Sequence, residues 1–134
     1  MTLFAYGTLL VPEIWRAVTG HECPSESASL PGYAIYRVRN ADFPGIIPGD
    51  SDDFVPGRIF SELNAEVLAR LDAYEDKFYD RIKVTLLSTT GDPLQSQAYV
   101  VSTDYTSALT SEPWTLEWFQ REAMSDYMAR HGFR

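Results

Sequence analysis

The middle of the chain reads Leu68-Ala69-Arg70-Leu71-Asp72-Ala73-Tyr74-Glu75-Asp76 and is predicted to complete a helix that begins after Asn64. Asn is among the residues preferred at a helix N-cap, so the helix is expected over residues 65–76. At about 100° per residue, Leu68, Leu71 and Glu75 fall on one stripe of this helix. Glu75 therefore occupies a position at which an apolar, core-facing residue is expected.

A carboxyl group on the buried face of a helix loses solvation, which raises its pKa and makes Glu75 a candidate proton carrier near neutral pH. Two other interpretations stay open from the pattern alone, because structural ion pairs leave the same signature. The helix could fray before Glu75, or Glu75 could pair with Arg81 or Lys83 on the following strand.

Apolar periodicity and turn residues predict the remaining elements. Strands are expected at 3–6, 33–38, 55–63, 79–88 and 95–102, the last two joined as an antiparallel hairpin through 89–93. Helices are expected at 12–18 and at about 112–131, and residues 21–31 and 40–56 are expected to be loops. The last helix carries an apolar stripe predicted to pack on the sheet: Trp114, Trp118, Phe119, Met124, Tyr127 and Met128. The prediction is one α+β domain over residues 1–134, with mostly antiparallel strands.

Composition excludes several classes of function. The 134 residues include 11 Lys and Arg and 19 Asp and Glu, for a net charge of −8. Such a chain repels nucleic acid and anionic lipid, so neither is expected as a partner. Cys23 is the only cysteine, which rules out an intramolecular disulfide and suits a reducing cytoplasm. No apolar stretch approaches a membrane span, and the first residues lack the basic region of a signal peptide. The expected location is cytoplasmic.

A second candidate site follows the first predicted strand, at Tyr6-Gly7-Thr8-Leu9. Glycine allows successive backbone N–H groups to converge on a carboxylate or carbonyl oxygen, so this loop is a candidate for binding a small ligand. A glycine after a strand is also the ordinary mark of a turn, and the motif alone does not separate the two interpretations.

Other kinds of site are poorly supported. His21 and Cys23 are close in sequence, but two His and one Cys are too few for an ordinary zinc site without several carboxylates. No Gly-x-Ser-x-Gly elbow is present, and His131 beside the end of the last helix is expected to be a solvated cap. Glycine-rich phosphate loops are absent. We therefore expect neither a metal nor an organic cofactor.

Five separated motifs resemble the gamma-glutamylcyclotransferase-like superfamily. They are Phe4-Ala5-Tyr6-Gly7-Thr8-Leu9, Leu30-Pro31-Gly32-Tyr33, Phe43-Pro44-Gly45-Ile46, Val55-Pro56-Gly57-Arg58-Ile59-Phe60, and Leu71-Asp72-Ala73-Tyr74-Glu75-Asp76 followed by Tyr79-Asp80-Arg81 and Val84. They occur in the order and spacing of the superfamily. The Glu75-Asp76 pair, with Asp where many cyclotransferases have Gly, is similar to the plant avirulence-induced and bacterial branch.

The resemblance implies a small mixed, mostly antiparallel β-barrel with flanking helices and a pocket between the first loop and the carboxylate. It implies that Glu75 is the catalytic residue. The backbone of Tyr6, Gly7, Thr8 and Leu9 would bind a gamma-glutamyl group. Tyr79 and Arg81 match the Tyr-x-Arg of the superfamily, and Tyr99 matches an aromatic residue near its pocket.

The implied reaction is a cofactor-independent acyl transfer. The alpha-amine of a gamma-glutamyl amide attacks its own gamma-carbonyl, releasing 5-oxoproline and a free amine, and one Glu accepts and returns the proton. Two alternatives stay open: the same pocket could bind a metabolite or protein without turnover, or it could support another amide cleavage or transfer. Fold alone does not decide among them.

Overall fold

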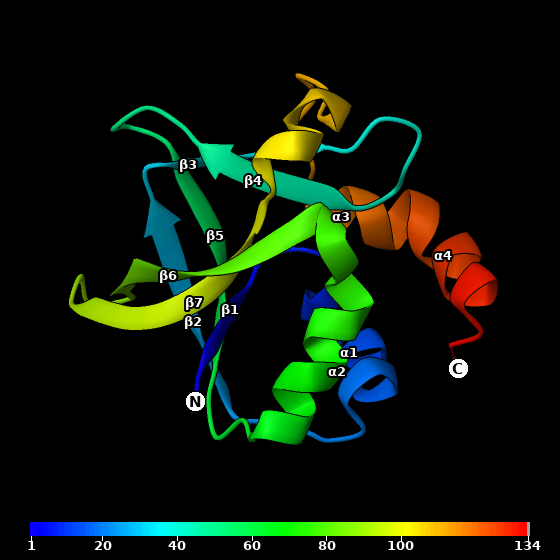
Figure 1. The fold of residues 1–134 in the computed structure, drawn as a ribbon, viewed down its shortest axis with the longest axis horizontal. Coiled ribbons are helices and arrows are strands. Elements are labelled where there is room, and N and C mark those ends of the chain that lie inside the picture. The colour runs from blue at the N-terminus through cyan, green and yellow to red at the C-terminus, as the bar shows by residue number, and fades with distance from the viewer. Residues whose placement is uncertain (134) are drawn as a thin grey trace.

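The computed structural model describes residues 1–133 and contains a closed five-stranded barrel with helices packed on its outside (Figure 1). The strands are β1 Leu3–Ala5, β2 Ser25–Pro31, β3 Tyr33–Arg37, β4 Pro44–Pro48, β5 Phe54–Phe60, β6 Tyr79–Ser88 and β7 Pro93–Val101. The α-helices are α1 Pro12–Thr19, α2 Ala65–Glu75, α3 Leu116–Trp118 and α4 Met124–His131. Shorter turns of helix are η1 Thr8–Leu10, η2 Asp76–Phe78, η3 Thr103–Ala108 and the π-helical η4 Phe119–Ala123. The expected α+β class and barrel are confirmed.

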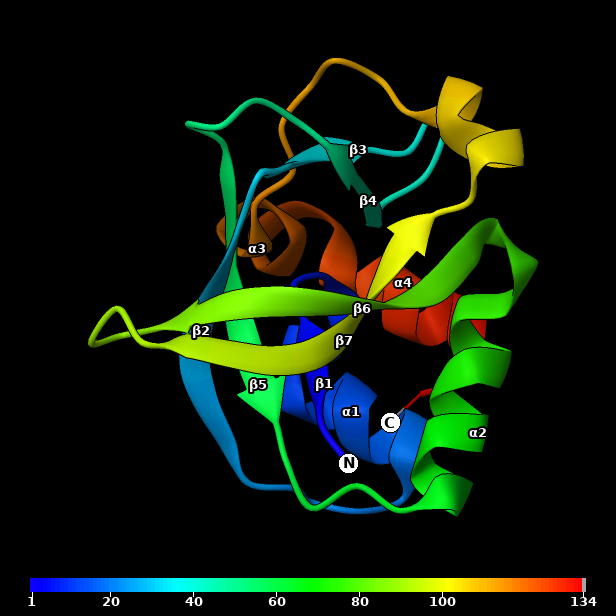
Figure 2. The same cartoon turned by 60° about the vertical axis from the view of Figure 1, so that its left-hand side comes forward.

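The barrel has the order β1-β5-β2-β6-β7 and closes where β1 meets β7. The β1–β7 contact is parallel and pairs Phe4 with Ala98, whereas the other barrel pairs are antiparallel. Strands β3 and β4 form a separate two-stranded sheet over one end of the barrel, as Figure 2 shows. The long β6–β7 hairpin brings Arg81 opposite Tyr99.

The residues of β1 contribute to two separate apolar clusters, because alternate residues of a strand point to opposite faces. Phe4 lies in an apolar cluster drawn from β4 and all the barrel strands. Leu3 and Ala5 belong to a second cluster, which α1, α2 and the C-terminal helices complete. This second cluster fixes the helices against the outside of the barrel near the end of β1, where the loop of the candidate site begins.

The predicted helix ends are confirmed for the first two helices. α1 begins at Pro12 and ends at Thr19, and the next residue, Gly20, has the left-handed φ of 75° that a C-capping glycine adopts readily. The Asn64 side chain accepts a hydrogen bond from the Val67 N–H and caps α2. The C-terminal helix was expected from about residue 112 but begins at Leu116, because the Thr115 side chain caps it by accepting from the Trp118 N–H.

Two predicted loops were wrong in part. Residues 21–31 contain β2, which pairs with β5 along its whole length. Its polar Ser and Glu residues give it the composition of a loop. Residues 40–56 contain β4 and the start of β5, although Pro44, Gly45 and Pro48 are residues typical of turns. In both cases pairing with another strand overrides local propensity: β2 pairs with β5, which is distant in the chain, and β4 pairs with the preceding strand β3.

Among the described residues, no helix has both the length and the apolar character needed to cross a membrane.

Candidate active site

A cavity of about 200 Å³ opens where the loop after β1, the end of α2, β4, β7 and α4 meet. Its lining residues are Phe4, Ala5, Tyr6, Gly7, Thr8, Leu9, Phe43, Pro44, Tyr74, Glu75, Phe78, Tyr79, Tyr99, Tyr127 and His131. The lining is largely aromatic, and Glu75 and His131 are its only residues with ionisable groups other than phenols. An apolar pocket with a few converging polar groups is the usual form of a small-molecule site.

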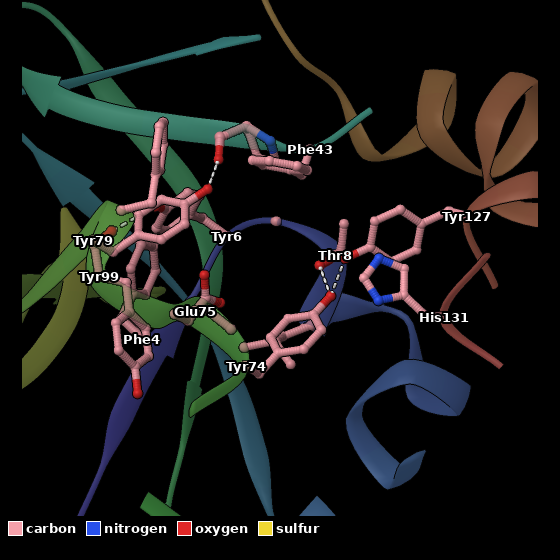
Figure 3. Close-up of a pocket in the computed structure, with 15 residues that line it drawn as sticks. Phe4, Tyr6, Thr8, Phe43, Tyr74, Glu75, Tyr79, Tyr99, Tyr127 and His131 are labelled. Atoms are coloured by element: carbon pink, nitrogen blue, oxygen red, sulfur yellow. Dashed lines mark hydrogen bonds between the residues drawn. The ribbon is translucent and has the colours of Figure 1, made fainter. Parts of the chain in front are cut away.

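Glu75 lies in the middle of this cavity, at the last residue of α2 (Figure 3). Leu71, one turn earlier on the same face, is fully buried, so the predicted helical phase is confirmed and α2 does not fray before Glu75. Glu75 is half-buried: protein atoms surround its carboxyl group, and part of the residue's surface borders the cavity. This burial raises the pKa of Glu75 to about 8.

Neither of the predicted ion pairs of Glu75 is present within residues 1–133. Arg81 instead pairs with Asp72, with its Nε 2.9 Å from Asp72 Oδ1 and a second nitrogen 3.1 Å from Oδ2. The hydrogen bonds from Arg81 hold the pKa of Asp72 below its usual value. The structure records no hydrogen bond or ion pair for the Glu75 side chain among these residues. Glu75 is therefore enclosed without a counter-charge.

The Asp72 carboxylate also fixes one wall of the cavity. It accepts a hydrogen bond of 2.7 Å from the Tyr99 hydroxyl, which binds the tyrosine of β7 to α2. Tyr99 lines the cavity as expected, whereas Arg81 is not among the lining residues. Arg81 donates hydrogen bonds to Asp72 and Gln97. Its contact with a substrate remains a prediction.

The loop after β1 is held close to β4. Gly7 lies so near Pro44 that a Cβ atom on Gly7 would come within 2.9 Å of Pro44 Cγ. The first hydrogen bond of the following turn runs from Leu10 N–H to Gly7 C=O at 3.0 Å. The N–H groups of Gly7, Thr8 and Leu9 precede this bond, and a helical turn leaves such groups without an internal partner. They border the cavity and are candidate donors to an oxygen atom.

Two predicted tyrosines are fixed through their hydroxyl groups. Tyr6 donates to the Tyr99 carbonyl oxygen at 2.5 Å, and Tyr79 donates to the Pro44 carbonyl oxygen at 2.5 Å. Burial first, and the nearby Glu75 charge among the further causes, raise the pKa of both phenols well above its usual value. Both hydroxyls therefore stay protonated at neutral pH.

On the opposite side of the cavity, the sequence had assigned only Thr8 to the site. There the hydroxyls of Thr8, Tyr74 and Tyr127 form a hydrogen-bonded chain, with 2.8 Å between the Thr8 and Tyr74 oxygens (Figure 3). The His131 ring packs at a tilt against Tyr127, with 4.3 Å between ring centroids. His131 was expected to be a solvated cap, and it is exposed at the end of α4 but also lines the cavity. The i, i+4 spacing of Tyr127 and His131, which places both on one helix face, is the signal that could have found them.

Within residues 1–133, no three His, Cys, Asp or Glu side chains lie together as a metal site would require. His21 and Cys23 lie outside the lining of this cavity.

Comparisons with known proteins agree with the resemblance found in the sequence. The chain is 30% identical to AIG2-like protein C of Arabidopsis thaliana over 127 residues, which cover 94% of this chain and 73% of that protein. It is also 30% identical to AIG2-like protein D of the same plant over 101 residues, 74% of this chain and 66% of that protein. The chain thus spans about two thirds to three quarters of the length of these relatives.

Solved structures show the same fold at low identity. The solution structure of an Arabidopsis thaliana protein has a TM-score of 0.74 at 21% identity and covers 97% of this chain and 78% of its own. A structure described as gamma-glutamyl cyclotransferase has a TM-score of 0.67 at 18% identity, covering 75% of this chain and 66% of its own. Residues 3–116 match the family described as "Gamma-glutamyl cyclotransferase, AIG2-like". Because that match covers most of the chain, the protein belongs to the gamma-glutamyl cyclotransferase, AIG2-like family.

Proposed function

We propose that this protein cleaves gamma-glutamyl amides into 5-oxoproline and a free amine, with Glu75 moving the proton. The observation that carries the proposal is the enclosed Glu75 carboxyl group, which has no ion-pair partner within residues 1–133 and shares a cavity with the N–H groups of the Gly7 loop. No Cys or Ser is among the residues that line this cavity. A gamma-glutamyl substrate needs neither, because its own alpha-amine is the nucleophile.

The proposed reaction balances without water or a cofactor. Ionised Glu75 takes one proton from the alpha-ammonium group, and the free amine attacks the gamma-carbonyl carbon to close a five-membered ring. Protonated Glu75 gives this proton to the leaving nitrogen, and the ionised carboxyl then takes the second proton that the attacking nitrogen must lose. The tetrahedral intermediate collapses as the bond to the leaving nitrogen breaks, and Glu75 passes the second proton to the departing amine, which leaves as an ammonium ion. The same carboxyl thus acts first as base and then as acid for each of the two protons.

The raised pKa of Glu75 suits both halves of this reaction. A carboxyl with the ordinary pKa near 4.5 would be a weak acceptor for an ammonium proton, whereas one at about 8 is a far better match. A substrate ammonium entering the cavity also supplies the missing positive charge, which stabilises the carboxylate form of Glu75 until the proton moves.

The N–H groups of Gly7, Thr8 and Leu9 would stabilise the negative charge that develops on the gamma-carbonyl oxygen. Donors held in place before reaction stabilise an oxyanion most effectively, because they need no reorganisation as the charge forms. The packing of Gly7 against Pro44 and the hydrogen bond from Tyr6 to the Tyr99 carbonyl both restrain this loop. We propose that the loop binds the gamma-glutamyl group and holds its amine and carbonyl at attack distance.

The test is release of 5-oxoproline from gamma-glutamyl amino acids, gamma-glutamyl amines and glutathione. We expect wild-type protein to release it from at least one substrate and Glu75→Gln to release none, because an amide keeps the shape but does not accept the proton. Asp76→Asn is the matched control, since it removes the same charge from the adjacent, exposed residue. Normal turnover by Glu75→Gln would refute the assignment. Saturable binding of these compounds without turnover by wild type would favour a binding module.

A further inference from the structure

The hydrogen-bond donors of the cavity are not evenly distributed. On the β7 side, the hydroxyls of Tyr6, Tyr79 and Tyr99 donate to the Tyr99 carbonyl, the Pro44 carbonyl and Asp72. Each phenol has one proton to donate, and all three protons already have acceptors. A ligand therefore meets aromatic faces on this wall but no free hydroxyl donor.

The α4 side retains unused donors. Thr8, Tyr74 and Tyr127 bring three hydroxyl protons to a chain that contains two hydrogen bonds, so one proton stays free for a ligand or water. His131 adds a ring N–H, which imidazole carries whether neutral or charged. Within residues 1–133 the His131 ring has aromatic neighbours in Tyr127 and Phe133 but no recorded hydrogen bond.

The unused donors belong partly to a segment that the family match does not reach. The match ends at residue 116, whereas Tyr127 and His131 lie on α4, over the residues 124–131. Tyr127 is buried and His131 is exposed at the rim, so this wall runs from the interior of the cavity to the solvent. Figure 3 shows Glu75 between this wall and the three tyrosines of the other side.

We propose that Tyr127 and His131 form the subsite for the leaving group, and that this subsite selects leaving groups that carry a carboxylate. The inference rests on the proposed function. The leaving nitrogen must lie within reach of Glu75 to receive its proton, and Tyr74, the residue before Glu75, is hydrogen-bonded to Tyr127. A substituent on that nitrogen extends toward solvent past His131, where a free hydroxyl proton and an imidazole N–H can both donate to one carboxylate.

Two substrates isolate this interaction. Gamma-glutamyl-alanine and gamma-glutamyl-ethylamide have the same reacting atoms, and their leaving groups differ only in the alanine carboxylate. A hydrogen bond to a charged group is stronger than one between neutral groups, and solvent at the rim weakens it in part. We expect the wild-type kcat/KM for gamma-glutamyl-alanine to exceed that for the ethylamide by about tenfold, the kinetic equivalent of about 1.4 kcal/mol.

His131→Phe keeps the aromatic packing and removes the donor. It is expected to lower kcat/KM for gamma-glutamyl-alanine about tenfold, mainly by raising KM, because the carboxylate contact is the same before and during the reaction. Turnover of the ethylamide should fall clearly less than turnover of gamma-glutamyl-alanine, and circular dichroism shows whether the variant is folded. His131→Lys should retain at least a threefold preference for gamma-glutamyl-alanine. His21→Phe, the same change at the only other histidine, should match wild type.

The outcomes separate the two proposals. Equal loss on both substrates in His131→Phe, or no wild-type preference between them, overturns the subsite and leaves the proposed reaction standing. Loss of preference in His21→Phe overturns it as well. No turnover of either substrate by wild type overturns the proposed reaction, and with it the subsite.

Discussion

Glu75→Gln is expected to stabilise the folded protein at alkaline pH, even though it removes the group on which turnover depends. In the unfolded chain the Glu75 carboxyl loses its proton near pH 4.5, and in the folded protein only near pH 8. Between these values the folded state binds more protons, so the free energy of unfolding falls as pH rises. A neutral amide at the same position has no such dependence.

The structure sets the size of the effect. Each unit of pKa shift corresponds to 1.36 kcal/mol, so a shift from 4.5 to about 8 has an upper limit of about 5 kcal/mol. Because Glu75 is only half-buried and borders the cavity, solvent lowers this limit, and we expect a gain of about 2–5 kcal/mol for Glu75→Gln at pH 8 or above. At pH 5 the gain should be below about 1 kcal/mol, because Glu75 is then protonated in the folded protein and its carboxyl in the unfolded chain is only partly ionised.

Urea unfolding at pH 5 to 9, followed by tryptophan fluorescence and circular dichroism, measures this difference. Comparing the two proteins at each pH cancels the contributions of other titrating groups. Asp76→Asn is the matched control and should show no comparable growth of stability with pH. The free energies of unfolding of Glu75→Gln and wild type could instead differ by less than 0.5 kcal/mol from pH 5 to pH 9. That result would refute the conclusion that the Glu75 carboxyl is enclosed and unpaired.

Three further results are expected. The kcat/KM for gamma-glutamyl substrates should rise with pH toward about 8, because free Glu75 becomes a base only as it ionises; an acidic limb centred near pH 4.5 would contradict this. Gly57→Ala should destabilise the protein by about 1–3 kcal/mol in urea unfolding, since the new Cβ meets the Ala5 carbonyl and the Phe4 ring; a loss below 0.5 kcal/mol counts against it. Asn64→Ala should cost about 1 kcal/mol and Asn64→Ser little, and equal losses would show that the side-chain cap is unimportant.

Elements with a strong local signal were predicted well. Pro12 and Gly20 bound α1, Asn64 caps α2, and alternating apolar residues mark β6, because each of these signals acts within a few residues of chain. Glu75 is the most informative case, since helical phase alone placed it on the face of Leu71.

Elements whose stability comes from partners were missed. Ser25 to Pro31 has the composition of a loop, but all seven residues pair in register with β5, from Ser25 opposite Phe60 to Pro31 opposite Phe54. Pro44 to Pro48 likewise becomes a strand by pairing with β3. The partner of β2 lies far along the chain, where no local pattern can indicate it, whereas β4 pairs with the neighbouring strand β3 and was missed because its Pro and Gly residues are typical of turns.

The sequence by itself determined the family, the class of fold and the phase of α2, and it singled out Glu75 as the candidate catalytic residue. Motif order and helical periodicity, on which these predictions rest, are properties of the chain. Only the tertiary structure decided that Arg81 binds Asp72 rather than Glu75, and that α4 brings Tyr127 and His131 to the same cavity. The physical reason is that enclosure and pairing depend on which surfaces meet. A carboxyl group acquires a pKa near 8 from its surroundings in three dimensions, and those surroundings come from β1, β7, α2 and α4 together.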